Sequence, residues 1–467
     1  MPSDRDRPAL DAGLLSPVTV GHDETVTDAA YLDALVTAEV ALARAFRETG
    51  LAPDEAVDEI ETEFGWQGAL RGCRDHGVDA ATLAAAAVAG GNPVIPLVGR
   101  LKERVGIDAR VWVHRGATSQ DIVDTAAMVV ARAATSRVVA ALVHTGVSLR
   151  SLARSRRDEV TAARTLTQHA VPTTVGLRAA GWLRGVERAK ERVEDVQHRL
   201  PAQLGGAAGT LASFAEIGGA DAAAALPAAF AHELGLAAPD APWHTSRWPI
   251  TELGDALVQA IDAVGKIATD VATLSRTEIG ELAEGAGGGS SAMPQKRNPA
   301  ASVLIRSAAL RAPQLGATLH LASALAADER PDGAWHAEWP TLRELLRLAL
   351  GATAHAATLV ADLHVDTDAV ARNLAATGGL IVSERLSIVL GPVRAAAGVA
   401  DLVTAAAAGG DLAALLAASP DVAAAAAERG VTPEALVADL LDPARYTGLS
   451  GRLVDEAAAP TAEEDDA

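Results

Sequence analysis

The chain has very few cysteine and aromatic residues. Its 467 residues include one cysteine, Cys73, and only 3% aromatic residues. A single cysteine excludes an internal disulfide framework, and Cys73 is expected to be a small, semi-buried side chain rather than a nucleophile. No apolar run of about 20 residues occurs, so we expect no membrane span. The charged start, MPSDRDRPAL, lacks the apolar segment of a signal peptide, which predicts a cytoplasmic protein.

Positive charge is also scarce, because the formal net charge is −20. Binding to nucleic acid needs a basic surface that such a chain lacks as a whole, so no nucleic-acid partner is expected. The segment 100–199 is an exception, since basic residues outnumber acidic ones there. Most of these basic residues should lie on solvated helix faces, while a minority could line a site for a small polyanion.

Strand-like alternation is scarce, and apolar residues recur at helical spacing almost everywhere. The clearest case is 251–280, where residues such as Leu253, Leu257 and Ile261 predict one long amphipathic helix. Similar helices are predicted from about 121 to 154 and from about 175 to 200. Helices of this length, with wide apolar stripes, indicate an extended bundle and an oligomer.

Proline and glycine residues suggest where the chain divides. We predict an N-terminal helical unit at 1–112, a unit of long helices at 113–363 and a small, alanine-rich helical unit at 364–454. The last residues, 455–467, are predicted to be a disordered acidic tail.

Three polar stretches are predicted to lie on three separate long helices. The first polar stretch is VHRGATSQD at 113–121, where Thr118 or Ser119 could alternatively cap a helix. The second polar stretch is ARTLTQHAVPTTVG at 163–176, which alone could be a helix-to-loop transition. The candidate site residues in these two stretches are His114, Thr118, Ser119, Arg164, Thr165, Gln168 and His169.

The third stretch, GGGSSAMPQKRNP at 287–299, is called the signature loop below. Its three glycines can take positive φ and act as a hinge, although a GGGSS string alone often marks a flexible linker. Hydroxyl, ammonium and amide groups within a dozen positions suit the binding of an anion. The candidate residues are Ser290, Ser291, Lys296 and Asn298.

A fourth polar cluster is ERPDGAWHAEW at 329–339, which contains Arg330 and His336. Arg330 is a candidate for binding a carboxylate, whereas the tryptophans around His336 could equally be core packing. Arg247, in PWHTSRW, is a similar but weaker candidate. Neither His114 nor His336 belongs to a metal-ligand spacing motif, so no metal site is expected.

The order and wording of these stretches resemble the signature regions of the fumarase/aspartase superfamily, over essentially the whole chain. GSSAMPQKRNP matches the superfamily pattern GSSxMPxKxNP without a gap. The resemblance implies an all-α, three-domain fold with five long helices per chain. It also implies a homotetramer with a twenty-helix core and active sites shared between three subunits. The implied chemistry is anti elimination of a group β to a carboxylate, or the reverse addition, without a cofactor.

The resemblance also implies roles for individual residues. Ser290 matches the base that removes the proton, and Ser291 can assist it. A free serine is too weakly acidic for this, so Lys296 and loop N–H groups would have to stabilise the alkoxide. Residues that match carboxylate-binding positions are Thr118, Ser119, Thr165, Gln168, Lys296 and Asn298.

One departure from the superfamily pattern is informative. Where fumarases and adenylosuccinate lyases carry His in Gly-Arg-Thr-His, this chain has Leu166, which cannot donate a proton to a leaving group. A carboxylate needs little such help, because its conjugate acid has a pKa near ~4. Leu166 therefore favours formation or opening of a lactone, and it also admits another good leaving group such as nitrite. His169 is either a substitute acid or a binding or structural histidine.

Within the superfamily, three runs of sequence resemble bacterial 3-carboxy-cis,cis-muconate cycloisomerases. They are GNPVIPLVG at 91–99, VPTTVGLRAAGWL at 171–183 and ERPDGAWHAEW at 329–339. This resemblance predicts a tricarboxylate substrate and a role in aromatic catabolism. A sister lyase acting on adenylosuccinate, argininosuccinate or nitrosuccinate is the alternative. An inactive helical scaffold is a further one, against which the intact Ser290, Lys296 and Asn298 count.

Overall fold

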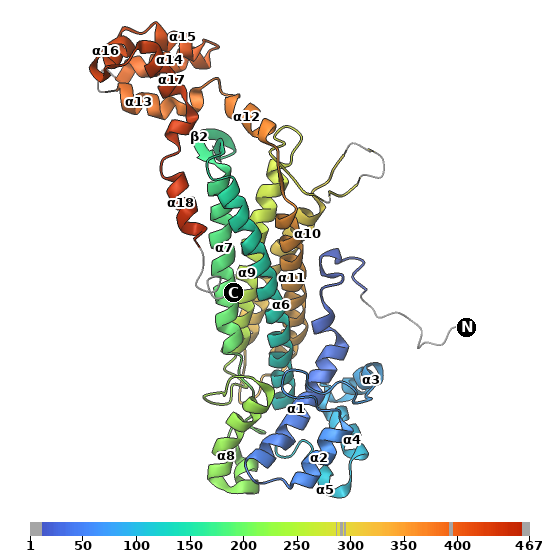
Figure 1. Ribbon diagram of the computed structural model, residues 1–467. Helices are drawn as coiled ribbons and strands as arrows, with labels where there is room; N and C mark the ends of the chain where they lie inside the picture. Colours follow the sequence, from blue (N-terminus) through green and yellow to red (C-terminus); the bar gives the residue numbers. More distant parts are fainter. Residues whose placement is uncertain (1–11, 286, 290–292, 294–295, 392–395, 460–467) are drawn as a thin grey trace. The chain divides into compact units, whose positions relative to one another are not determined.

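Helices dominate the chain (Figure 1). The computed structural model describes residues 12–285, 287–289, 293, 296–391 and 396–459, so the predicted catalytic residues Ser290 and Ser291 lie outside the described residues. Within these ranges, the β-strands form two short two-stranded antiparallel sheets. The prediction of an all-α fold is confirmed.

Five of the helices are between 24 and 37 residues long. They are α6 (Ser119–Ser155), α7 (Val175–His198), α9 (Trp248–Leu274), α10 (Ala300–Ala324) and α11 (Gly333–Ala361). The long helices predicted at 121–154 and 175–200 are confirmed as α6 and α7. The apolar stripe of α9, including Leu253, Leu257 and Ile261, is fully buried as its spacing predicts.

The predicted end of α9 was wrong, because the helix stops at Leu274 and not at Gly280. Gly280 adopts a φ of 67°, and its N–H donates to the carbonyl of Arg276 at 2.8 Å. This left-handed residue closes a turn after the helix, as glycine often does at a helix end.

The chain divides into two compact units. One consists of 1–142, 188–265 and 304–355, and the other of 143–187, 266–303 and 356–467. We call them unit 1 and unit 2. Each of the five long helices contributes residues to both units, so these boundaries differ in kind from the predicted division at 112 and 363, which stays a prediction.

In unit 1, short helices surround a buried α1. Helix α1 (Asp28–Glu48) packs against α2 (Asp54–Glu63) and α8 (Ala212–Leu234), while α3 (Ala80–Gly90) packs against α4 (Val94–Arg104). Helix α5 (Ile107–Arg110) contacts α2.

Cys73 also lies in unit 1 and is fully buried. Burial raises the pKa of its thiol to about 12. Cys73 is thus more deeply buried than the predicted semi-buried side chain, and its raised pKa agrees with the prediction that it is not a nucleophile.

Unit 2 contains both sheets. Strands β1 (Val160–Thr165) and β2 (Gln168–Thr174) form a hairpin, and α12 (Thr367–Ala375) packs on β1. The short strands β3 (Leu282–Ala283) and β4 (His364–Val365) pair with each other.

A separate helical core in unit 2 is built by residues such as Leu386, Leu416 and Leu440. It is formed by α13 (Ser383–Leu390), α14 (Ala396–Ala407), α15 (Leu412–Ala417), α16 (Pro420–Arg429) and α17 (Pro433–Leu441).

The predicted disordered tail starts too early. Helix α18 (Ser450–Ala457) continues past residue 455, and Val454 and Ala457 are buried. The carboxylate of Asp455 accepts two hydrogen bonds of 2.7 Å from the guanidinium of Arg157. The acidic composition concealed this docked helix, because the ion pair and the apolar residues act together.

Helix α6 is long and apolar enough to cross a membrane by length and composition alone. Core helices of water-soluble proteins pass the same test, and 44% of the apolar window of α6 is buried. The absence of a membrane span stays a prediction.

Candidate active site

The second polar stretch forms the β1–β2 hairpin and does not lie on a long helix. Arg164 pairs with His169 and Thr165 with Gln168, so Leu166 and Thr167 form a two-residue turn. Their φ values are 47° and 73°, a left-handed conformation that costs energy for a bulky or β-branched residue. The Leu166 side chain is 96% exposed. A strained, exposed apolar tip of this kind is found where position matters for function.

A cavity of about 890 Å³ in unit 2 contains three of the predicted site residues. Arg164, Gln168 and His169 line it from the hairpin, while Thr165 lies exposed on the same hairpin. The cavity also has cationic residues that sequence reasoning did not select. They are Arg178 on α7, Lys266 on α9 and Arg276 in the turn after α9.

A buried carboxylate, Glu281, organises the arginines of this cavity. Its oxygens accept hydrogen bonds from Arg164 at 2.5 and 3.2 Å and from the Asn373 amide at 2.9 Å. Burial alone would raise the pKa of Glu281, but the bonds from Arg164 and Asn373 and the nearby positive charges outweigh it and lower the pKa. The carboxylate therefore stays ionised and fixes the Arg164 guanidinium.

Arg178 is less completely paired. Its Nη1 lies 3.7 Å from Glu281, and its Nη2 donates to the Ala162 carbonyl at 3.4 Å. Burial is the largest influence and lowers the pKa of Arg178, with Glu281 offsetting only part of it. A desolvated guanidinium with long contacts can gain from binding a carboxylate.

The cavity is also lined by an acidic residue, Asp270, which two neighbouring side chains hold in place. Lys266 contacts both carboxylate oxygens of Asp270 at 2.5 and 2.6 Å, and the indole N–H of Trp182 donates to Asp270 at 2.8 Å. This pairing neutralises Lys266 locally, as Glu281 does for Arg164, so Arg178 and Arg276 are the cations of this cavity with the most capacity left for a ligand.

The first polar stretch lies in unit 1, where it leads into α6. Thr118 is buried, and its backbone N–H donates to the Asp121 carboxylate at 2.9 Å. In a capping box, the acidic residue three positions after the cap makes this contact. Thr118 therefore occupies the cap position of α6, although within the described residues neither its hydroxyl nor that of Ser119 makes a hydrogen bond.

His114 also lies in this stretch and contacts a buried carboxylate. Its Nδ1 is 2.7 Å from Glu39, whose side chain is 2% exposed. Burial alone would lower the pKa of His114, but the charge of Glu39 and the hydrogen bond to it outweigh burial and raise the pKa.

This pair predicts a pH dependence of stability. Because the folded pKa of His114 lies above the unfolded value of 6.5, the stabilisation is fully present below pH 6.5 and is lost as the pH rises through the folded pKa. His114→Phe should therefore lower the thermal midpoint more at pH 6 than at pH 9. The control His198→Phe removes an exposed histidine whose one hydrogen bond within the described residues is to the Glu194 carbonyl of its own helix. Equal effects of His114→Phe at both pH values would contradict the pairing.

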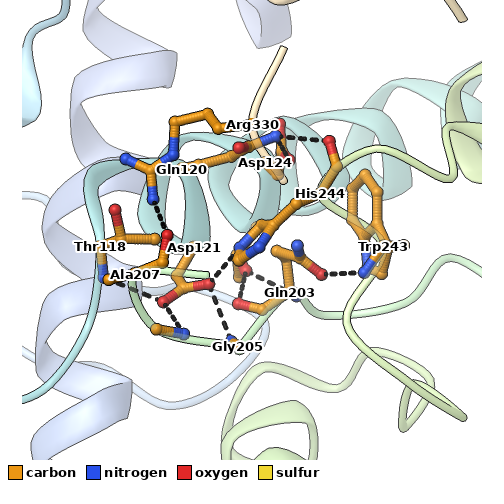
Figure 2. Close-up of polar contacts among 12 residues, drawn as sticks. Thr118, Gln120, Asp121, Asp124, Gln203, Gly205, Ala207, Trp243, His244 and Arg330 are labelled. Carbon is orange, nitrogen blue, oxygen red and sulfur yellow. Dashed lines mark hydrogen bonds and ion pairs between the residues drawn. The ribbon is translucent and has the colours of Figure 1, made fainter. Parts of the chain in front are cut away.

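Arg330 and His336 also belong to unit 1. Arg330 donates to the Ala207 carbonyl at 2.9 Å (Figure 2). Both ring nitrogens of His336 are 3.0 Å from backbone carbonyls, those of Asp332 and Gly91. His336 therefore joins the start of α11 to the run GNPVIPLVG.

The weaker candidate Arg247 is not available to a substrate. It is 2% exposed and donates to Asp124 at 2.7 and 3.0 Å and to Glu338 at 2.6 to 3.2 Å. Trp335 is buried beside it and donates its indole N–H to Asp124. Trp335 is therefore a core residue, as the packing alternative predicted. Arg247 has a structural role, because it pairs with two buried carboxylates.

The described part of the signature loop lies in unit 2 and is closed at its base. The backbones of Gly288 and Asn298 exchange two hydrogen bonds of 2.8 Å, and the Asn298 amide donates to the Gly289 carbonyl at 3.3 Å. A Cβ on Gly288 would lie 2.9 Å from the Ala300 Cβ. Glycine is therefore required at position 288 because a side chain there would collide with Ala300. Backbone conformation is not the reason, since none of Gly287, Gly288 and Gly289 has a positive φ. Lys296 is exposed.

The predicted site residues therefore fall into three groups within the described part of the chain. Thr118, Ser119, His114, Arg330 and His336 belong to unit 1. Arg164, Gln168 and His169 share the basic cavity of unit 2, and Lys296 and Asn298 belong to the signature loop. Within the part of the chain that the structure describes, no hydrogen bond or ion pair between side chains joins the loop to the cavity.

Among the residues that the structure describes, one cluster has the spacing to hold a metal ion. Ligand atoms of Glu48, His232 and Glu233 lie within 4.8 Å of one another. Arg44 already donates to Glu233 at 2.6 Å, which competes with a cation. The absence of a metal cofactor stays a prediction.

Comparison with known proteins decides the family. The sequence matches the family described as lyase over residues 23–313. The chain belongs to the fumarase/aspartase superfamily. A superfamily relative, the nitrosuccinate lyase of Streptomyces davaonensis, is 46% identical over 459 residues, covering 96% of this chain and 94% of the relative. The 3-carboxy-cis,cis-muconate cycloisomerase of Bradyrhizobium diazoefficiens is 38% identical, and the match covers 92% of this chain and 93% of that relative.

The fold of the superfamily is found here too. The crystal structure of the 3-carboxy-cis,cis-muconate lactonizing enzyme from Pseudomonas putida superimposes with a TM-score of 0.85 at 33% identity, covering 96% of this chain and 98% of that one. The chain is therefore an enzyme of this superfamily by family and by fold.

Several residues of the site were missed by sequence reasoning. Arg178 lies in the run VPTTVGLRAAGWL, which was selected for its wording and not for its charge. Lys266 and Asp270 are four positions apart on α9, a spacing that marks an ion pair on one helix face. The role of Glu281 could not be predicted, because nothing in the sequence around it indicates a fully buried carboxylate.

Proposed function

We propose that the chain is a β-eliminating lyase that releases nitrite and fumarate from nitrosuccinate. Ser290 takes a proton from the CH2 carbon, and the electrons of that C–H bond form the C=C double bond. The electrons of the C–N bond leave with nitrite. Atoms and charge balance, and no electron acceptor is needed.

The observation that carries this reaction class is Leu166. Amine and hydroxide leave poorly unless a protein acid protonates them, and leucine has no proton to give. Nitrite leaves as a stable anion, because its conjugate acid is comparable in strength to a carboxylic acid. The exposed, left-handed Leu166 at the hairpin tip supports a role as an apolar wall beside such a leaving group.

The cations of the unit 2 cavity support an anionic substrate. Arg178 has long contacts and a lowered pKa, so a substrate carboxylate would improve its pairing. Arg164 is held by Glu281 and presents a fixed charge to the same cavity. Together these side chains suit a dicarboxylate, with Lys296 and Asn298 of the signature loop as further carboxylate-binding residues.

A second candidate is 3-carboxy-cis,cis-muconate cycloisomerase, the reaction that the sequence wording predicted. There the group that adds or leaves is a carboxylate of the tricarboxylate substrate, so Leu166 fits equally well. Several cycloisomerase relatives favour it. We place nitrosuccinate first because the identity to the nitrosuccinate lyase is higher.

We also propose that the complete site is shared between subunits of a homotetramer. Apolar side chains on α10 support an oligomer, since Val303, Leu310 and Leu321 are 53%, 76% and 63% exposed. Positions 303, 310 and 321 recur at multiples of the helical repeat and share one face. Light scattering should give the mass of four chains, and the mass of one chain would contradict this proposal.

A substrate panel tests the proposed function. The purified protein is assayed with nitrosuccinate, 3-carboxy-cis,cis-muconate, adenylosuccinate and argininosuccinate, and kcat/KM is compared. We expect the highest value with nitrosuccinate. A higher value with carboxymuconate would favour the second candidate. Turnover of adenylosuccinate or argininosuccinate alone would contradict the argument from Leu166.

A further inference from the structure

We infer that Asp121 and His244 form a buried pair that positions the carboxylate-binding residues of unit 1. The inference rests on the proposed function, because it assigns those residues to substrate binding. Neither side chain is a catalytic residue, since Asp121 is fully buried and His244 is 4% exposed. Both would affect substrate binding by fixing the positions of Thr118 and Arg330.

Asp121 uses both carboxylate oxygens to join two segments that are distant in sequence (Figure 2). Its Oδ2 accepts from the N–H of Thr118 at 2.9 Å and from the N–H of Gly206 at 3.0 Å. Its Oδ1 accepts from the N–H of Gly205 at 2.9 Å and contacts Nε2 of His244 at 2.8 Å. One side chain thus fixes the start of α6 against the loop 205–210.

The contact with Asp121 defines how His244 must be protonated. An ionised carboxylate only accepts hydrogen bonds, so Nε2 of His244 carries the proton that it donates. Within the described residues, Nδ1 has no hydrogen-bond partner. The imidazole therefore has one directed polar contact, and that contact is to Asp121.

Glycine makes the approach of His244 to the loop possible. A Cβ on Gly205 would lie 2.9 Å from Cε1 of His244 and 2.8 Å from the Cβ of Pro242. Gly206 has a φ of 74°, which points its N–H toward Asp121 at little conformational cost. The pair therefore explains why glycine occupies positions 205 and 206 of the loop.

The pair controls where Thr118 and Arg330 lie. Arg330 is exposed, and its one directed contact within the described residues is to the Ala207 carbonyl of the same loop. The hydroxyl of Ser213, just after the loop, donates to the Gly116 carbonyl of the first polar stretch at 2.6 Å. Loss of the His244 contact would let the loop shift, and Thr118 and Arg330 would shift with it.

The contacts behind the pair hold His244 in place. The amide N of Gln120 donates to the His244 carbonyl at 2.9 Å and to Asp124 at 3.1 Å. Asp124 is in turn held by Arg247. The backbone of His244 is therefore fixed independently of its ring, so a change of side chain tests the ring contact alone.

The experiment compares His244→Leu with the conservative variant His244→Gln. The glutamine amide can donate to Asp121 as Nε2 does, whereas leucine cannot. For His244→Leu we expect KM for nitrosuccinate to rise roughly 10- to 100-fold with kcat changed about threefold or less. His244→Gln should stay within about threefold of wild type in both constants.

A second readout separates this inference from the proposed function. Binding of succinate, a dicarboxylate that cannot eliminate, is measured by calorimetry for wild type, His244→Leu and His244→Gln. The dissociation constant should rise in parallel with KM for leucine and be restored by glutamine. If wild type binds succinate but does not turn over nitrosuccinate, the proposed function fails while the pair is still tested by binding.

Several results would overturn the inference. One is that His244→Leu has the same KM and the same affinity for succinate as wild type. Another is an equal loss in both His244 variants with a lowered thermal midpoint, which would make His244 a packing residue only. Absence of succinate binding by wild type would also overturn it. If His244→Leu does not fold, Asp121→Asn replaces it, with the same rise in KM and dissociation constant expected.

Discussion

Replacing Ser290 by alanine should lower kcat by roughly 100- to 10,000-fold while KM changes little, because positioned proton transfer contributes about that much to rate. The substrate would still be bound by Arg164, Arg178 and the signature loop. What is lost is the group that accepts the proton from carbon. The measurement is steady-state kinetics on nitrosuccinate, with succinate binding as proof that the site is intact.

The matched control is Ser307→Ala on α10. Ser307 is exposed, and its hydroxyl donates only to the Leu304 carbonyl of its own helix at 2.7 Å. Its removal should leave kcat and KM unchanged. If Ser290→Ala kept wild-type kcat, Ser290 would not be the base, and Ser291 would be examined next by the same substitution.

Replacing Arg247 by leucine should destabilise the fold by about 3–5 kcal/mol, because two carboxylates lose their partner in a buried site. Asp124 and Glu338 are each 2% exposed and would have no cation to pair with. Denaturant unfolding of wild type and variant measures the difference. The control is Arg188→Leu, which breaks an exposed pair with Glu191 and should change stability little.

The loss in Arg247→Leu should depend on pH. Burial raises the pKa of Glu338 and Asp124 raises it further, while Arg247 lowers it, and the net pKa lies above 4.5. A carboxyl group with a raised folded pKa loses stability as the pH rises. Without Arg247 the pKa would rise more, so the variant's deficit should be larger at pH 8 than at pH 5. A deficit independent of pH would mean that packing, not charge, holds this site.

The fold was largely predictable because long helices carry a strong periodic signal. The limits of α6 and α7 followed from apolar spacing, whereas the end of α9, where Gly280 closes a turn, and the start of the tail were misjudged. The β1–β2 hairpin was missed because its turn is Leu166–Thr167. Two-residue hairpin turns normally use asparagine or glycine at such left-handed positions, so Leu166 and Thr167 carry no turn signal.

The site was predictable only where chemistry is concentrated in a short run of sequence. Arg164, Gln168 and His169 are close in sequence, and they line one cavity. Glu281 contributes to the same cavity from more than 100 positions away, through Arg164. His244 meets Asp121 in the same manner. Such partners are set by tertiary packing, which local spacing does not encode.

The central claim is elimination of an anion that needs no proton from the protein. The most direct measurement follows fumarate and nitrite together during turnover of nitrosuccinate by the wild-type protein and by Ser290→Ala. Wild type should release the two products in equal amounts, and Ser290→Ala should release neither at a comparable rate. Nitrite without fumarate, or no products from nitrosuccinate while carboxymuconate is consumed, would contradict it.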